Sequence, residues 1–135
     1  MKVLKFGGTS VKTSENIKKV ISIVNDISTG TETVVVVSAL GGITDRLHKS
    51  ATQASIADSN YISTYKEIQK RHNDILSKLL PKRNKTVLKK LTDLLAELEG
   101  LLKGIFLVKE LSPKSLDYIL SFGERLSSLL IHEAF

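Results

Sequence analysis

Two apolar segments that each run into a pair of glycines constrain the fold of this chain more than any other feature. Residues 3–6 lead directly into Gly7-Gly8, and the four valines of residues 34–37 lead through three further residues into Gly41-Gly42. Short apolar runs that end near glycine predict strands followed by tight turns. A β-branched run without alternation is typical of a parallel strand that is covered on both faces. Between the two segments, apolar residues recur at helical spacing at Ile17, Val20, Ile21, Val24 and Ile27. The pattern therefore predicts a strand–helix–strand unit with a parallel sheet.

The remainder of the chain predicts helices. A helix is expected to begin near Ile43 or Thr44 and to run towards Ala57. Apolar residues then recur at helical spacing in 61–79, 87–102 and 113–135. Pro81 ends the helix expected at 61–79. Gly100 and Gly104 interrupt the apolar stripe that begins at Val87. We expect these two helices to form an antiparallel pair that is joined by the basic turn 82–85. The short apolar stretch 105–108 does not distinguish a strand from a helix.

Capping residues mark two helix starts, and no signal marks the last helix end. Thr13 or Ser14 can cap the first helix, and Gly30 lies a few residues past its end. Ser112-Pro113 combines an N-cap serine with a proline at the first helical position. The last helix runs to Phe135 without a glycine, a proline or a polar tail. Because a parallel sheet needs more than two strands, the sequence reads as the front half of a larger α/β domain.

The composition is that of a globular protein. The 135 residues suit one domain, and a chain with 41% hydrophobic and 25% charged residues can bury a core and stay soluble. The absence of cysteine excludes disulfides, thiolate zinc sites and cysteine nucleophiles. No apolar run is long enough to span a bilayer, and the first residues carry no secretory signal. We therefore expect a cytoplasmic protein with its natural amino terminus and no membrane partner.

The charges and histidines favour neither nucleic acid nor a metal site. The formal net charge of +6 suits an anionic ligand such as a nucleotide, or simply a solvated surface. Only 5% of the residues are aromatic and tryptophan is absent, so bases would find few stacking partners, and the basic cluster 82–90 has no interleaved aromatics. His48, His72 and His132 lack metal-ligand spacing. We expect His72, which lies on an apolar helix face, to be a partly buried core residue.

The first candidate for chemistry is the loop that follows the first strand. Gly7 and Gly8 let the backbone approach a ligand closely, and their amides can point at phosphate oxygens. Thr9 and Ser10 add hydroxyl groups, and Lys5 can place an ammonium near the same phosphates. The spacing is neither that of a Walker loop nor that of the dinucleotide fingerprint. A tight turn beside a surface lysine remains the alternative.

Two further segments could join this loop. Residues 38–45 also follow a strand and open a helix. Since ligands of parallel sheets bind beyond the carboxyl ends of the strands, both glycine loops can face one crevice. The other reading is two ordinary turns. Gly123 lies in the middle of a helix, where it costs about 1 kcal/mol relative to alanine, so close packing or a ligand should offset it. Glu124 beside it could bind an ammonium group, although a helical glutamate is usually solvated.

These three segments together resemble the signatures of aspartokinases, within the amino-acid kinase family. Residues 5–11 (Lys-Phe-Gly-Gly-Thr-Ser-Val) resemble the opening signature, residues 38–45 the second, and residues 123–127 (Gly-Glu-Arg-Leu-Ser) the third. They occur in order and span the chain. Asp45 departs from the pattern, because many relatives have Asn there. Residues 111–125 also look like the kinase half of bifunctional aspartokinase/homoserine dehydrogenases. The resemblance implies the α/β sandwich of that family, with a parallel sheet and, in this portion, many helices.

The resemblance also implies an activity. It implies phosphoryl transfer from ATP, bound with Mg²⁺, to the side-chain carboxylate of L-aspartate. The product is 4-phospho-L-aspartate, at the entry to lysine, threonine and methionine synthesis. The resemblance assigns phosphate binding to Lys5, Gly7, Gly8, Thr9 and Ser10, with Lys5 also stabilising charge on the transferring group. It assigns aspartate binding to Ser38, Thr44 and Glu124, with Glu124 holding the α-ammonium group.

Aspartokinases continue well beyond the length of this chain. We therefore expect residues 1–135 to be a partial catalytic domain that lacks the nucleotide half and the regulatory ACT domains. Such a fragment would be inactive alone, and its exposed sheet edge should favour a homo-oligomer. Two other hypotheses stay open. One is a non-catalytic αβ module for assembly or ligand sensing, and the other is a kinase for glutamate or a related amino acid.

Overall fold

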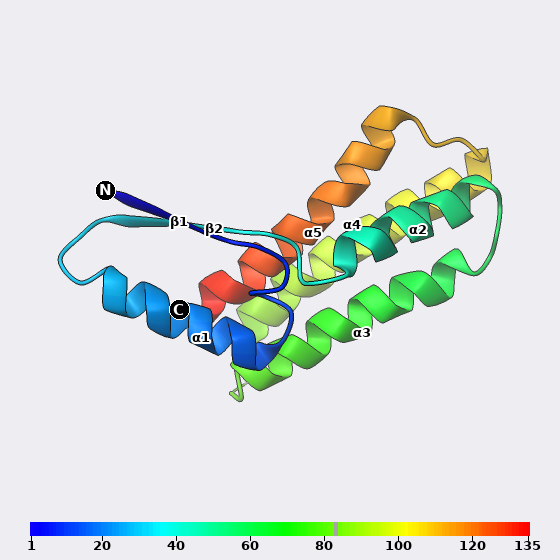
Figure 1. The fold of residues 1–135 in the computed structure, drawn as a ribbon. Helices are drawn as coiled ribbons and strands as arrows, with labels where there is room; N and C mark the ends of the chain where they lie inside the picture. The colour runs from blue at the N-terminus through cyan, green and yellow to red at the C-terminus, as the bar shows by residue number, and fades with distance from the viewer. Residues whose placement is uncertain (83) are drawn as a thin grey trace.

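A computed structural model describes residues 1–82 and 84–135. It contains a small β-α-β unit followed by a group of helices (Figure 1). In chain order the elements are β1 (Lys2–Phe6), α1 (Ser14–Ile27), β2 (Thr33–Val37), α2 (Ile43–Ser55), α3 (Tyr61–Leu79), α4 (Lys85–Val108) and α5 (Pro113–Ala134). The predicted helix-rich α/β fold with a parallel sheet is confirmed. Arg83, in the predicted basic turn 82–85, lies outside the described residues. No helix in the described part of the chain has the length and hydropathy of a membrane span.

The β-α-β unit follows from its local sequence. β1 and β2 pair in parallel, with Lys2 opposite Thr33 and Phe6 opposite Val37. The Thr13 side chain caps α1, since its Oγ1 accepts a hydrogen bond from the backbone N–H of Asn16 at 3.1 Å. Because parallel strands point the same way, the loops that leave β1 and β2 start at the same edge of the sheet.

One prediction about the sheet is wrong, because only one of its faces is covered. Val3, Val34 and Val36 share a face and are 62%, 44% and 44% exposed. The other face packs against helices. There Val35 and Val37 line a hollow together with side chains of α1 and α5. Burial therefore alternates along β2, although the sequence of four valines does not, because both helices lie on the same side of the sheet.

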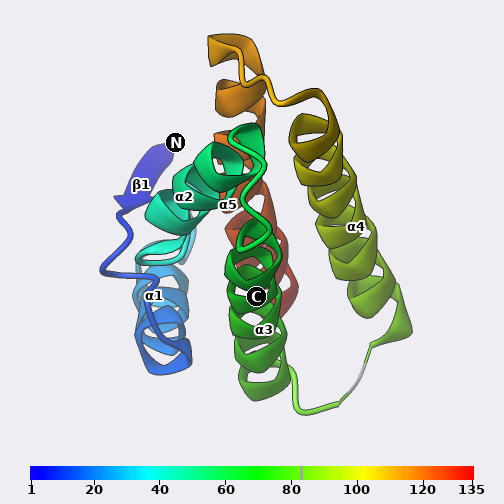
Figure 2. The same cartoon turned by 90° about the vertical axis from the view of Figure 1, so that its right-hand side faces the viewer.

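The helices that follow the sheet pack around α2, and their buried side chains form one core that extends to α1. Buried apolar residues of α2 include Ile43, Leu47, Ala51 and Ala54. α3 and α4 run in opposite directions, as predicted (Figure 2), but each packs more extensively on α2 than on the other. α4 runs unbroken through Gly100 and Gly104 and includes residues 105–108, whose type the sequence left open, so the glycines interrupt the apolar stripe but not the helix. Ser112 caps α5 with Pro113 in the first turn, as predicted.

Candidate functional site

The two glycine loops lie against each other at the carboxyl edge of the sheet. A Cβ atom added to Gly41 would lie 3.0 Å from the carbonyl oxygen of Gly8 and 2.9 Å from Cγ of Lys12. A Cβ added to Gly8 would lie 3.5 Å from the carbonyl oxygen of Ala39. These distances leave room only for hydrogen at position 41. The glycines thus let two loops that are far apart in the sequence pack together at the edge where parallel sheets bind ligands.

The first loop keeps several backbone donors free. The N–H groups of Ser10 and Val11 donate to the carbonyl oxygens of Gly7 and Gly8 at 3.1 and 3.3 Å, which folds the loop into a tight double turn. The N–H groups of Gly7, Gly8 and Thr9 donate to no acceptor among the described residues. Asn16 of α1 steadies the loop, because its side-chain amide donates to the carbonyl oxygen of Thr9 at 3.2 Å. Free amides in a glycine turn suit phosphate oxygens.

Lys5 lies one residue before the end of β1, on the open face of the sheet. It is exposed and pairs in register with Val36 of β2. Within the described chain, its ammonium group makes no hydrogen bond or ion pair with another residue. The ammonium is therefore free to bind an anion beside the first loop.

The second loop ends at the start of α2. Gly42 adopts φ +85°, a left-handed conformation that favours glycine, and it provides no side-chain cap for the helix. The N–H of Ile43 donates to Leu40 at 2.9 Å. The next two N–H groups, those of Thr44 and Asp45, have no such partner in the described residues. Thr44 is exposed in this first turn, so its hydroxyl and these amides are available together.

α5 brings the third motif to the second loop. A Cβ added to Gly123 would lie 2.7 Å from Cβ of Ala39, so the helix backbone packs directly on the loop. One turn later the buried Ser127 hydroxyl donates to the carbonyl oxygen of Ser38 at 2.6 Å. Glu124 lies between these two contacts in sequence and is exposed. The structure thus places the helical segment that carries Glu124 beside Ser38, although no hydrogen bond joins these two side chains among the described residues.

Sequence reasoning missed two residues that hold this arrangement. Ser127 belongs to the third motif, but the motif alone assigns it no role. The signal in the sequence is its position on the apolar face of the helix, where a hydroxyl needs a partner. Arg71 lies in no motif. Its guanidinium donates to the carbonyl oxygens of Gly41 and Lys12, so α3 contacts both loops. A long-range side-chain contact of this kind leaves no pattern in the local sequence.

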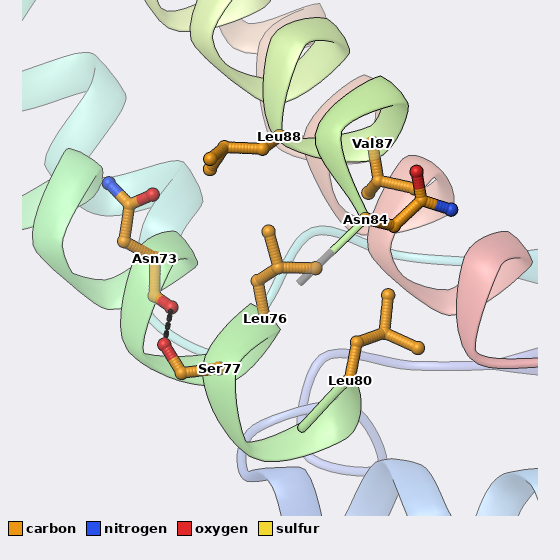
Figure 3. Close-up of a pocket in the computed structure, with 7 residues that line it drawn as sticks. All are labelled: Asn73, Leu76, Ser77, Leu80, Asn84, Val87 and Leu88. Carbon is orange, nitrogen blue, oxygen red and sulfur yellow. Dashed lines mark hydrogen bonds between the residues drawn. The ribbon is translucent and has the colours of Figure 1, made fainter. Parts of the chain in front are cut away.

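A hollow between α3 and α4 has a more apolar lining than the glycine loops and lies apart from them. It has a volume of about 230 Å³ and lies where the end of α3 meets the start of α4. The side chains of Leu76, Leu80, Val87 and Leu88 gather around it, with Asn73, Ser77 and Asn84 at its margins (Figure 3). Among the described residues, its lining includes none of the candidate residues and no charged side chain. We therefore place the candidate site at the glycine loops.

Gly123→Ala should lower the free energy of unfolding by about 2 kcal/mol, because the new methyl group overlaps Ala39. Adding Ala39→Gly should recover most of this loss, since it removes the atom that clashes. Gly104→Ala is the matched control. It lies in the helix interior of α4 with no atom within 4 Å of its added Cβ, so it should raise stability by up to about 1 kcal/mol. Urea unfolding measures all four proteins. Equal stability of the Gly123→Ala and Gly104→Ala variants would contradict the close approach of α5.

Comparison with known proteins shows similarity to the amino acid kinase family and to aspartokinases. The sequence model of the amino acid kinase family matches residues 1–135. The chain is 35% identical over 129 residues to aspartokinase 1, chloroplastic, of Arabidopsis thaliana, covering 93% of the chain and 22% of that protein. It is 30% identical over 134 residues to a bifunctional aspartokinase/homoserine dehydrogenase 1, chloroplastic, of Zea mays, covering 98% of the chain and 14% of that protein. The chain thus spans about a fifth of the aspartokinase and less of the bifunctional protein.

Solved structures agree with these matches. The structure of E. coli aspartokinase III in complex with aspartate and ADP superposes with a TM-score of 0.85 at 27% identity, over 99% of this chain and 28% of that one. A Clostridium acetobutylicum aspartate kinase superposes with a TM-score of 0.74 at 24% identity, over 96% of this chain and 28% of that one, and supports the fold alone.

Proposed function

Since the chain belongs to the amino acid kinase family, we propose that it carries the aspartate- and phosphate-binding loops of an aspartokinase. The reaction is phosphoryl transfer from MgATP to the side-chain carboxylate of L-aspartate, which is the entry step to lysine, threonine and methionine synthesis. A carboxylate oxygen forms a bond to the γ-phosphorus, the bond from that phosphorus to the β–γ bridging oxygen breaks, and ADP leaves with 4-phospho-L-aspartate as the product. The observation that carries the proposal is the contact between the three motifs, through Gly8 with Gly41 and through Ala39 with Gly123.

The first loop is the phosphate side of the proposed site. The free N–H groups of Gly7, Gly8 and Thr9 would bind phosphate oxygens, and the hydroxyl of half-buried Ser10 would add a donor. Lys5 would bring its free ammonium to the transferring phosphoryl group. No cluster of three or more His, Asp or Glu side chains that could hold a metal ion exists among the described residues. Mg²⁺ would therefore reach this part of the site on the phosphates of the nucleotide.

The second loop and α5 form the aspartate side. The hydroxyls of Ser38 and Thr44 would bind the substrate, together with the free amides at the start of α2. The Glu124 carboxylate would hold the α-ammonium group, which distinguishes an amino acid from a plain dicarboxylate. E. coli aspartokinase III, which shares this fold, is described as a complex with aspartate and ADP, and this supports both ligand assignments.

The chemistry suits a site without a strong base. The carboxylate of aspartate is already ionised at neutral pH, so no side chain has to remove a proton from it. Catalysis then depends on placing the carboxylate in line with the γ-phosphoryl group and on neutralising the charge that develops there. The described loops offer amides and hydroxyls for this task, and Lys5 offers an ammonium group beside them.

We also propose that residues 1–135 form a partial catalytic domain. The chain covers only 22% of the Arabidopsis aspartokinase and 28% of the E. coli structure. The adenine site and further catalytic charges would then belong to other parts of the enzyme, and residues 1–135 alone would not turn over substrate. The open face at Val3, Val34 and Val36 supports burial against such a part or against a second copy in a homo-oligomer.

The test is an acyl-phosphate assay on the protein at the length that its gene encodes. Hydroxylamine traps the product as a hydroxamate, with aspartate, glutamate or succinate as the acceptor. We expect product with aspartate and MgATP and at least about tenfold less with glutamate, because one extra methylene changes binding at a fitted site by that order. With succinate we expect at least about 10⁴-fold less, because the Glu124 carboxylate would lose its ammonium partner. Preference for glutamate would indicate another amino-acid kinase. Absence of product and of aspartate binding would favour a non-catalytic assembly module.

A further inference from the structure

Arg71 of α3 is the polar link between the two glycine loops. Its guanidinium donates one hydrogen bond to the carbonyl oxygen of Gly41 at 2.6 Å and another to the carbonyl oxygen of Lys12 at 2.8 Å. Lys12 closes the first loop, just before the capping residue of α1, and Gly41 lies in the second loop, just before α2. A planar guanidinium is suited to this task because it presents several N–H groups in a fixed fork.

Hydrogen bonds of the sheet join the two strands up to the start of the loops, where the N–H of Ser38 donates to the carbonyl oxygen of Phe6 at 3.0 Å. Arg71 supplies the hydrogen bonds to the loops themselves. Among the described residues, no hydrogen bond runs directly from residues 7–13 to residues 39–42. The loops otherwise meet through van der Waals contacts, at Gly41 with Gly8 and with the Lys12 stem. Such contacts resist closer approach but do little to prevent separation. The two donors of Arg71 supply the missing restraint.

The surroundings keep the guanidinium in place. Arg46 of α2 lies nearby and forms an ion pair with Glu67 of α3 at 3.1 Å, so it does not compete for the same carbonyls. Burial lowers the pKa of Arg71 from its ordinary value, and the charge of Arg46 lowers it further. The guanidinium still carries its charge at neutral pH, because its ordinary pKa is far above 7. On its other side Arg71 borders a separate hollow of about 240 Å³ between α3 and the start of α1. This hollow is also lined by Asp74, Lys78, Lys12 and Glu15.

We propose that Arg71 is a positioning residue that sets the distance between the two glycine loops. This role rests on the proposed function, in which the first loop holds the phosphates and the second leads to the aspartate site. Each substrate contacts mainly one side of the site. Loss of the two Arg71 hydrogen bonds should therefore leave each substrate able to bind, while the carboxylate and the γ-phosphoryl group lose their alignment. A change in turnover without a matching change in KM is the expected signature.

The experiment compares Arg71→Met, Arg71→Lys and Lys78→Met in the protein at the length that its gene encodes. Lys78 lies two helical turns further along the same face of α3 and lines the same hollow, so Lys78→Met removes one charge nearby without touching either carbonyl. The measurements are kcat and KM for both substrates, thermal unfolding, and hydrogen exchange of peptides that cover residues 7–13 and 38–42.

We expect Arg71→Met to lower kcat about 10- to 100-fold with both KM values within about twofold of wild type. Exchange should accelerate in both loops, while Lys78→Met should match wild type in every measurement. Arg71→Lys keeps the charge and stem but not the fork, so its kcat should fall less. If Arg71→Met does not fold, Arg71→Lys takes its place in the comparison with wild type and Lys78→Met.

Wild-type kcat and wild-type loop exchange in a folded Arg71→Met variant would overturn the proposal. Equal increases of both KM values with unchanged kcat would also overturn it, because they would indicate loss of binding rather than of alignment. If the wild-type protein does not phosphorylate aspartate, the proposed function fails. The exchange of the two loops then still decides whether Arg71 holds them together.

Discussion

Replacing Lys5 by alanine should lower the turnover number for aspartate phosphorylation by about 100- to 1000-fold, a range typical for the loss of one group that stabilises transition-state charge. The KM for aspartate should change by less than about threefold, since Lys5 acts on the phosphoryl group and not on the amino acid. Steady-state kinetics with aspartate and MgATP on the protein at the length that its gene encodes measures both values.

The exposed position of Lys5 allows a change in turnover to be separated from a change in stability. Its side chain is exposed and makes no hydrogen bond with another described residue, so its removal should not lower stability. Lys2→Ala is the matched control on the same strand. Lys2 is also exposed, and its ammonium group donates a long hydrogen bond to the carbonyl oxygen of Ile27, at 3.5 Å. Unchanged turnover in a folded Lys5→Ala variant would remove Lys5 from the proposed mechanism, whereas equal losses in both variants would indicate a general effect of charge.

Acidification should destabilise the fold through His72. The side chain is completely buried in α3, its Nδ1–H donates to the carbonyl oxygen of Ile68 at 2.7 Å, and Nε2 has no partner among the described residues. Burial lowers the pKa of His72 to about 4, from an ordinary value of 6.5. A proton on Nε2 would place an unpaired charge in the core, so the folded state keeps the imidazole neutral.

The sign of the effect follows from this difference. Between pH 6.5 and pH 4 the unfolded chain binds a proton that the folded chain does not, so the free energy of unfolding falls as the pH falls through this window. Below about pH 4 both states are protonated at His72 and its contribution no longer changes. The loss through this residue should total about 3 kcal/mol.

Urea unfolding at pH 7, 5 and 4 tests the assignment. His72→Leu should show a clearly smaller loss of stability over this range than wild type, because leucine fills similar space without a titrating group. It should cost little at pH 7, since Nε2 is already without a partner. His48→Leu, at an exposed position of α2, should keep the wild-type pH dependence. An unchanged pH dependence in His72→Leu would show that other groups cause the acid destabilisation.

The helices were predictable where their signals are local. Thr13 and Ser112 cap the helices for which they were proposed, and α3 ends before Pro81. α4 continues through Gly100 and Gly104 because each glycine costs a helix only about 1 kcal/mol relative to alanine, and packing of the long apolar face of α4 offsets this cost. The four valines of β2 led to the wrong prediction that the strand is covered on both faces. Their pattern indicates strand propensity, but it does not indicate which face a neighbouring helix covers.

The sequence by itself determined the elements, their order and the three motifs, because periodicity, capping and glycine turns act over a few residues. Only the tertiary structure decided how the motifs meet. The hydrogen bonds of Arg71 to Gly41 and Lys12 and of Ser127 to Ser38 join residues that are 30, 59 and 89 positions apart. Contacts over such separations depend on how whole helices pack, and packing is a property of the assembled core that no short stretch of sequence carries.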